Sequence, residues 1–169
     1  LVWSAIYSYS KRFTWLCHYI LGSVLGLAPI AGWIAYKPEF NLVFVLLGLG
    51  VMFWVAGFDI LYAAQDVDFD RSQNLKSIPA RFGLEPAFGY AAFSHVNTVI
   101  FYALAGLAFG AGWIYFVAWA IVSLVLVVEH FIISPHDLSR INLSFFTLNG
   151  IVSMVLLAGV LGDLFFKSQ

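Results

Sequence analysis

The sequence predicts an all-α protein that spans a membrane several times. Hydrophobic residues occupy 62% of its 169 positions and charged residues only 10%, whereas about 25% of an ordinary soluble domain is charged. The apolar residues form long runs, each near or above the ~20 residues that a helix needs to cross a bilayer core. A run such as IYFVAWAIVSLVLVV lacks the polar stripe, at a period of about 3.6 residues, of a soluble amphipathic helix. We therefore predict a polytopic transmembrane helical bundle.

Five apolar runs predict about five spanning helices. In chain order they cover residues 13–36, 42–66, 86–109, 113–133 and 145–166. Pro29 lies inside the first run and predicts a kink or a local unwinding there. Gly22 and Gly26 have the spacing of close helix contacts. The one substantial polar connection, residues 66–85, is where we expect chemistry to be located.

The distribution of lysine and arginine predicts the orientation of the bundle. Five crossings place the segments 1–12, 67–85 and 134–144 on one side of the membrane. That side holds six basic residues: Lys11, Arg12, Arg71, Lys76, Arg81 and Arg140. The other side holds only Lys37 and Lys167, so we expect the first side to be cytoplasmic. The net charge of −1 says nothing by itself about partners; we expect no nucleic-acid partner.

Acidic residues concentrate at the end of the second run, in the stretch FDILYAAQDVDFDRSQNLKSIPARFG (58–83). It contains four aspartates: Asp59, Asp66, Asp68 and Asp70. If the helix continues through residue 70, steps of about 100° per residue place Asp66 and Asp70 within about 20° of Asp59, and Tyr62 about 60° to one side. Asp68 would point away from this face.

Carboxylates on one poorly solvated face need a cation to balance them. Oxygen ligands without clustered His or Cys suit Mg²⁺ or Mn²⁺, and Mg²⁺ is often held by one or two carboxylates, with water and a substrate phosphate completing its shell. Asp66 and Asp70, four residues apart, have the spacing for this. The alternative is a solvated acidic helix end balanced by nearby basic residues. Asp59 argues against it, because an ionisable residue inside a spanning helix indicates function.

The same stretch resembles the second aspartate-rich motif of the UbiA superfamily of intramembrane prenyltransferases, D-x-x-Y-A-x-x-D-x-x-x-D followed by K-S and F-G. YSYSKRFTWLCHYILG (7–22) is similar to the family segment in which a basic pair precedes a helix, and INLSFFTLNGIVS (141–153) to its last-helix signature. The resemblance is strongest to the 4-hydroxybenzoate polyprenyltransferase-like members.

The resemblance implies that residues 1–169 are the C-terminal part of a single nine-helix prenyltransferase domain. The family's first motif, N-D-x-x-D-x-x-x-D, does not occur in this sequence. We expect the missing N-terminal helices of the same protein to carry it, and this chain alone to be incomplete and inactive; the alternative is a second chain that supplies the rest of the site.

The resemblance also implies an activity. The enzyme would use Mg²⁺ to transfer a polyprenyl group from a polyprenyl diphosphate to a small aromatic acceptor such as 4-hydroxybenzoate, in ubiquinone or menaquinone biosynthesis. We expect an integral protein of the lipid bilayer, in a bacterial inner (plasma) membrane, with its active site on the cytoplasmic side. The long isoprenoid tail would enter from lipid while its diphosphate stays at the membrane edge.

Roles for individual residues follow from the resemblance. Asp66 and Asp70 would bind the metal, Asp59, Tyr62 and Lys11 would be catalytic, and Asn149 would line the substrate cavity. The diphosphate would be bound by Lys11, Arg12 and Lys76. Several of these assignments have alternatives: Arg12 as a positive-inside anchor, Tyr62 as an interfacial aromatic residue, and Asn149 as an interhelical packing residue.

Two other readings remain open from the sequence. A fragment of a polytopic ion-coupled transporter would also carry intramembrane acids, and a non-catalytic membrane scaffold would leave the aspartate face unexplained. We expect His18, His95, Glu129 and His130 to be polar groups inside the bundle or at its interfaces.

Overall fold

The computed structural model describes residues 2–167, and all of the long elements in this range are α-helices. The helices on the N-terminal side are α1 (Val2–Ser10), α2 (Cys17–Tyr36), α3 (Leu42–Ala63), α4 (Val67–Ser72) and α5 (Ile78–Phe82). Those that follow are α6 (Leu84–Phe109), α7 (Trp113–Ile132), α8 (Ile141–Leu143) and α9 (Asn149–Lys167). A 3₁₀ turn at Ala64–Asp66 joins α3 to α4, and a π-helical turn at Ser144–Leu148 joins α8 to α9.

Five helical segments of the described chain are long and apolar enough to cross a bilayer, which confirms the predicted number of spans. They cover Cys17–Tyr36, Leu42–Ser72, Leu84–Phe109, Trp113–Ile132 and Ile141–Lys167. Helix α2 runs through Pro29 without a break, so the local unwinding considered from the sequence is absent there. The protein is a polytopic integral membrane protein.

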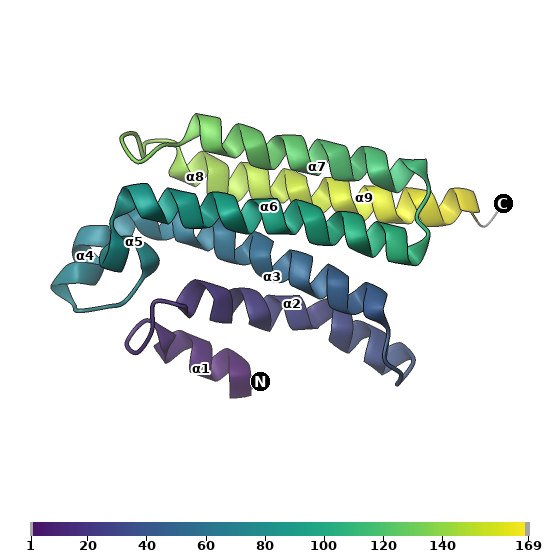
Figure 1. Cartoon of the computed structure of the whole chain (residues 1–169), viewed down its shortest axis with the longest axis horizontal. Helices are drawn as coiled ribbons and strands as arrows, with labels where there is room; N and C mark the ends of the chain where they lie inside the picture. The colour runs from purple at the N-terminus through teal and green to yellow at the C-terminus, as the bar shows by residue number, and fades with distance from the viewer. Residues whose placement is uncertain (1, 168–169) are drawn as a thin grey trace.

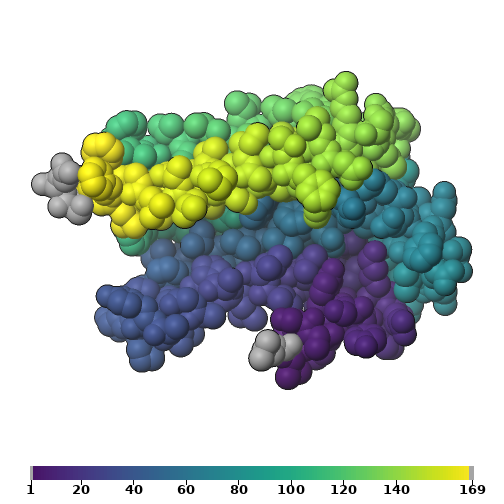
Figure 2. Space-filling view, turned by 180° about the vertical axis from the view of Figure 1, so that it is seen from behind, coloured from purple at the N-terminus to yellow at the C-terminus, as the bar shows by residue number. Residues whose placement is uncertain are grey.

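The long helices lie side by side in three layers (Figure 1). α1 and α2 form one outer layer, α3 and α6 the middle, and α7 and α9 the other outer layer. α2 packs very closely on α3: a methyl group added to Gly22 would overlap the carbonyl oxygen of Met52, and one on Gly26 would overlap that of Gly48. The predicted close contacts of these glycines are therefore present. From behind, α3 lies at the bottom of a furrow between α9 and the α1–α2 layer (Figure 2).

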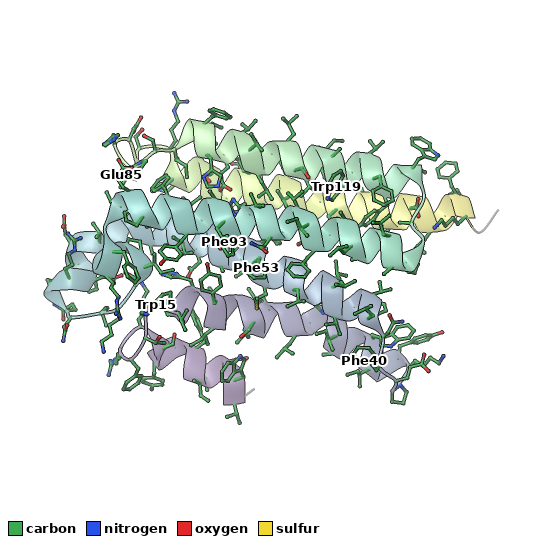
Figure 3. The ribbon with its side chains drawn as sticks, in the orientation of Figure 1. Trp15, Phe40, Phe53, Glu85, Phe93 and Trp119 are labelled. Atoms are coloured by element: carbon green, nitrogen blue, oxygen red, sulfur yellow. The ribbon has the colours of Figure 1, made fainter. Side chains whose placement is uncertain are left out.

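Aromatic rings fill the contact between α3 and α6 near the middle of the bundle. Phe53 of α3 stacks on Phe101 of α6, with ring centroids 5.6 Å apart, and meets Phe93 edge-on at 6.3 Å (Figure 3). Large aromatic pairs of this kind contribute about 0.5–1.5 kcal/mol beyond their buried area.

A second packing centre anchors α5 under the ends of α3 and α6. Ile78 of α5 and Ile60 of α3 are fully buried and belong to one apolar cluster with Ile133 and Ile141. Gly83 has φ +92°, a conformation that side-chain-bearing residues rarely adopt, and it is the single residue between the end of α5 and the start of α6. This packing fixes the position of the segment that carries Lys76 and Ser77.

Candidate active site

The residues singled out from the sequence lie at one end of the bundle, at the left of Figure 1. Asp59 is in the last turns of α3, Asp66 closes the 3₁₀ turn, and Asp70 is in α4. Lys11 lies in the turn between α1 and α2, and Lys76 lies just before α5. The three segments with most of the basic residues share this end, as the predicted topology requires.

Asp70 is buried and is held by two partners. The Lys11 ammonium lies 3.3 Å from Asp70 Oδ2, and the Ser77 hydroxyl donates to the same oxygen at 2.5 Å. Ser77 Oγ also accepts from the Ala80 N–H at 3.4 Å, as the N-cap of α5. A buried carboxylate is stable only when it is paired and hydrogen-bonded, and Lys11 supplies the charge. An ammonium has three donors, and the Lys11 side chain is 35% exposed, so it can contact a second anion.

The backbone joins the two basic segments of the site. The Lys76 N–H donates to the Lys11 carbonyl at 2.7 Å, and the Lys76 ammonium donates to the Phe13 carbonyl at 3.4 Å. Arg12 is exposed, with its guanidinium carbon 5.7 Å from the centre of the Tyr9 ring. The structure thus joins the segments of Lys11 and Lys76, whereas the Arg12 side chain contacts Tyr9.

Asp59 has a partner that the sequence did not identify. His18 Nδ1 lies 2.6 Å from Asp59 Oδ2, and His18 Nε2 accepts from the Ile78 N–H at 3.2 Å. Because Nε2 is the acceptor, Nδ1 carries the proton that is donated to Asp59. Burial raises the pKa of the Tyr7 phenol, and the nearby Asp59 charge raises it further. Asp59 therefore accepts a hydrogen bond from His18 and lies near the Tyr7 phenol.

The His18 contact joins three elements that come from different parts of the chain. His18 belongs to α2 and is fully buried, Asp59 belongs to α3, and Ile78 begins α5. We predicted His18 as an interior polar group, which is confirmed, but missed its contact with Asp59. The signal was present: two ionisable residues within predicted spans each needed a partner.

The partners of Asp59 and Asp70, His18 and Ser77, meet at the start of α5, but the three carboxylates differ in burial and contacts. The 3₁₀ turn at Ala64–Asp66 interrupts the helix between Asp59 and Asp70, because it advances about 120° per residue in place of about 100°. Asp59 contacts His18, Asp66 is exposed, and Asp70 is buried against Lys11. Asp68 lies elsewhere, as predicted, in a hollow that Glu85 and His136 also line.

The available side-chain donors fit a Mg²⁺ ion that takes only part of its coordination shell from the protein. Within residues 2–167, no group of three or more His, Cys, Asp or Glu side chains is placed to hold a metal ion. Asp66 is exposed, and both contacts of Asp70 use Oδ2, which leaves Oδ1 for another ligand. Mg²⁺ is commonly bound by one or two carboxylates with water and a substrate phosphate, and these two residues match that donor set.

Tyr62 and Asn149 lie on the α9 side of α3. The Tyr62 ring is 4.3 Å from the Phe145 ring, centre to centre. Asn149 Oδ1 accepts from Trp54 Nε1 at 2.8 Å, and its Nδ2 donates to the Phe145 carbonyl at 3.1 Å. The Asn149 amide therefore joins α3 to α9 and supports the aromatic wall beside Tyr62.

A separate polar cluster is buried between α6, α7 and the π-helical turn. His95 Nδ1 lies 3.0 Å from His130 Nε2 and 3.5 Å from Glu129 Oε2, and Ser144 donates to Glu129 Oε1. His95 and Glu129 are almost fully buried, which confirms the prediction that they are interior groups.

We predict that His18→Met weakens the link between Asp59 and α5, whereas His18→Gln preserves it. A glutamine amide can accept from Ile78 and donate to Asp59, but a thioether is a weak acceptor and no donor. Losing hydrogen bonds at a charged group corresponds to about a 10- to 100-fold effect. We expect hydrogen exchange at the Ile78 amide to be about 10-fold faster in His18→Met and near the wild-type rate in His18→Gln.

His136→Gln is the control for this comparison, because His136 is a histidine whose side chain is 84% exposed. It should leave exchange at Ile78 unchanged. A wild-type exchange rate in His18→Met would contradict the assigned hydrogen bond.

Comparison with known proteins agrees with this geometry. The UbiA prenyltransferase family model matches residues 1–151. The chain is 31% identical over 118 residues to the mitochondrial 4-hydroxybenzoate polyprenyltransferase of Arabidopsis thaliana, covering 69% of this chain and 29% of that protein. It is 28% identical over 160 residues to the 4-hydroxybenzoate octaprenyltransferase of Aromatoleum aromaticum, covering 94% of this chain and 53% of that protein.

A solved structure, the apo form of a UbiA homolog from Aeropyrum pernix K1, superposes with a TM-score of 0.84 and is 32% identical. The match covers 96% of this chain and 61% of that one. The chain thus spans about half or less of the length of these curated relatives. The family model covers nearly all of the chain, and the fold agrees, so the chain belongs to the UbiA prenyltransferase family.

Proposed function

We propose that this chain is the C-terminal part of a membrane enzyme that transfers a polyprenyl group from a polyprenyl diphosphate to an aromatic acceptor such as 4-hydroxybenzoate. The observation that carries the proposal is the pairing of Lys11 with buried Asp70, beside Lys76 and exposed Asp66, at one end of an apolar bundle. Cations and carboxylates at the edge of a lipid-embedded bundle suit a ligand with a charged head and an apolar tail.

The proposed role of each residue follows from its charge and its contacts. Lys11, Arg12 and Lys76 would bind the diphosphate, whose oxygens accept charge-assisted hydrogen bonds. Asp66 and Asp70 would hold Mg²⁺, which as a Lewis acid stabilises charge on the leaving oxygen. Asp59, fixed by His18, would orient a substrate group, and Tyr62 would face developing cationic charge with its ring. Asn149 would support the cavity wall through its bond to Trp54.

The bond changes are simple. The bond between the donor's first carbon and the diphosphate oxygen breaks, and its electron pair leaves with the diphosphate. A ring carbon of the acceptor bonds to the freed carbon and loses a proton. The apolar helices would exclude water, which would otherwise capture the allylic cation.

We place the reaction in quinone biosynthesis at the cytoplasmic side of a bacterial inner membrane. The excess of lysine and arginine at the site's end of the bundle supports this orientation. Membership in a prenyltransferase family favours this function over the ion-coupled transporter considered from the sequence. We also propose that N-terminal helices of the same protein, beyond this chain, complete the site.

The test is an assay of the complete protein in detergent, with a labelled polyprenyl diphosphate and a panel of aromatic acceptors that includes 4-hydroxybenzoate. We expect a prenylated product that requires both an acceptor and Mg²⁺ and is lost with a chelator. Absence of product with every acceptor, together with ion flux in liposomes, would favour the transporter instead.

A further inference from the structure

A basic hollow and an aromatic groove adjoin each other at the start of α2 and α6, where Arg81 of the hollow lies near Trp15 of the groove. The basic hollow is lined by Arg71, Asn74, Leu75, Lys76, Ala80 and Arg81. The aromatic groove runs between the start of α2 and the first turns of α6, and is lined by Trp15, Leu16, Tyr19, Pro86, Gly89, Tyr90 and Phe93. Lys76 is assigned above to the diphosphate, but Arg71, Arg81 and the aromatic groove have no role in the proposed prenyl transfer.

The basic hollow has the chemistry of an anion site. Three of its lining side chains are cationic, and none of the described residues that line it is acidic. Arg71 Nε donates to the Ala80 carbonyl at 3.1 Å, which fixes the guanidinium while its terminal N–H groups stay available. A guanidinium presents several donors in a planar fork that matches the oxygens of a phosphate.

Arg81 connects the basic hollow to the aromatic groove. Its guanidinium carbon lies 6.0 Å from the centre of the Trp15 ring and 5.2 Å from that of the Phe82 ring. Trp15 stands at the end of the groove nearest the site, and Phe93 lies further along the same face (Figure 3). Tryptophan and tyrosine gather at the level of lipid headgroups, so the groove begins at the headgroup boundary and extends into the acyl region.

Gly89 keeps the groove open. It is exposed, and a Cβ atom placed on it would meet nothing within 4 Å. A larger side chain at this position would therefore occupy the groove without disturbing the packing of α6.

We infer that the basic hollow and the aromatic groove together bind one anionic phospholipid. Its phosphate would contact Arg71 and Arg81, and an acyl chain would lie along Tyr19, Tyr90 and Phe93. Charge complementarity supports an anionic headgroup, and the apolar groove beside it supports a lipid chain. A soluble phosphate would use only the hollow, and a neutral lipid would use only the groove. The phosphate contacts assigned to this lipid are Arg71 and Arg81, which leaves Lys76 for the diphosphate of the proposed reaction.

Native mass spectrometry of the complete protein tests this inference, with phosphatidylglycerol and phosphatidylcholine as the two probes. We expect one phosphatidylglycerol to be retained at least about 10-fold more tightly than phosphatidylcholine. The double variant Arg71→Gln/Arg81→Gln should weaken phosphatidylglycerol binding by about 30-fold, because it removes two positive charges that each attract the anionic headgroup with the usual strength of a surface Arg. Gly89→Leu should weaken it by about 10-fold through loss of the groove.

Two matched variants serve as controls. Arg140→Gln removes an exposed arginine from the same end of the bundle, and Gly150→Leu fills another exposed glycine position with nothing within 4 Å. Both should retain the lipid as wild type does, and thermal unfolding in phosphatidylcholine should be the same for all variants.

Equal retention of the two lipids, or equal losses in the control variants, would overturn the inference. Glycerol phosphate that competes as well as phosphatidylglycerol would show a phosphate site instead. A change of oligomer mass in Gly89→Leu, with lipid binding intact, would show that a second copy covers the groove. These readouts do not require prenyl transfer, so failure of the proposed function would be recognised separately.

Discussion

Replacing Asp66 with asparagine is expected to lower kcat/KM for prenyl transfer by about 100-fold or more, with little change in stability. Asp66 is exposed at the end of a 3₁₀ turn, and its side chain makes no hydrogen bond within residues 2–167, so the fold does not depend on its charge. If it holds Mg²⁺, the loss removes several kcal/mol of charge stabilisation at the leaving oxygen, and each 1.36 kcal/mol is a factor of ten in rate. Product formation against Mg²⁺ concentration would measure this, and the apparent Mg²⁺ requirement should rise.

Asp68→Asn is the matched control for that experiment. Asp68 is also exposed and lies two residues away, but it lines the hollow beside Glu85 and His136. We expect it to keep activity within about 3-fold of wild type. Equal losses in the two variants would point to the general negative charge of α4, and wild-type activity in Asp66→Asn would contradict the metal assignment.

The membrane fold could be predicted from the sequence because the bilayer imposes a simple constraint. A helix must satisfy its own backbone and carry about 20 apolar residues to cross, and residues 113–133 fulfil this without any knowledge of neighbours. Helix α7 was observed at Trp113–Ile132, one residue from the predicted end. The first spanning helix begins four residues later than its apolar run, because residues 13–16 form a turn that hydropathy cannot distinguish from a helix.

The helical periodicity of the sequence predicted only part of the arrangement of the site. A step of 100° per residue correctly separated Asp68 from its neighbours, but it could not foresee the 3₁₀ turn at Ala64–Asp66. No strong helix breaker occupies those three positions, so single-residue propensity carries no signal there. Periodicity also could not foresee that Asp70 is buried against Lys11 while Asp66 is exposed.

The sequence indicated which buried polar residues need a partner from a distant segment, but not which residue that partner is. Asn149 was expected to need a partner because a buried amide is costly when unpaired, and Trp54, 95 residues away, supplies it. Lys11 and Asp70 are 59 residues apart and His18 and Asp59 are 41 apart. Which acid meets which base depends on how α1, α2 and α4 pack at one end of the bundle, and that is a property of the tertiary fold.

The Lys11–Asp70 pair provides the second prediction, in which stability and activity should separate. Lys11→Met leaves a buried carboxylate without its cation. The cost for a fully buried pair would be about 3–5 kcal/mol, but the Lys11 side chain is 35% exposed, so water partly replaces it and we expect about 1–3 kcal/mol. Asp70→Asn should cost less, because the amide oxygen still accepts from Ser77 and Lys11 can turn to solvent.

The double variant Lys11→Met/Asp70→Asn distinguishes the structural role from the functional one. Because it removes both charges, we expect it to be more stable than Lys11→Met alone, measured by thermal unfolding of the complete protein in one detergent. Prenyl transfer should stay at least about 100-fold below wild type in all three variants. Lys11→Met removes a diphosphate contact, Asp70→Asn removes a metal ligand, and the double variant removes both.

Lys37→Met is the control for this cycle. Lys37 and Glu39 form an ion pair of 2.8 Å at the opposite end of the bundle, with both side chains about half exposed. Pairs of this kind contribute about 0–1 kcal/mol, so the variant should unfold close to wild type and retain activity. If Lys11→Met were as stable as Lys37→Met, Asp70 would not depend on Lys11 for its charge balance. If the double variant recovered wild-type prenyl transfer, the pair would be only a structural bond, and the diphosphate and metal would have to bind elsewhere in the complete enzyme.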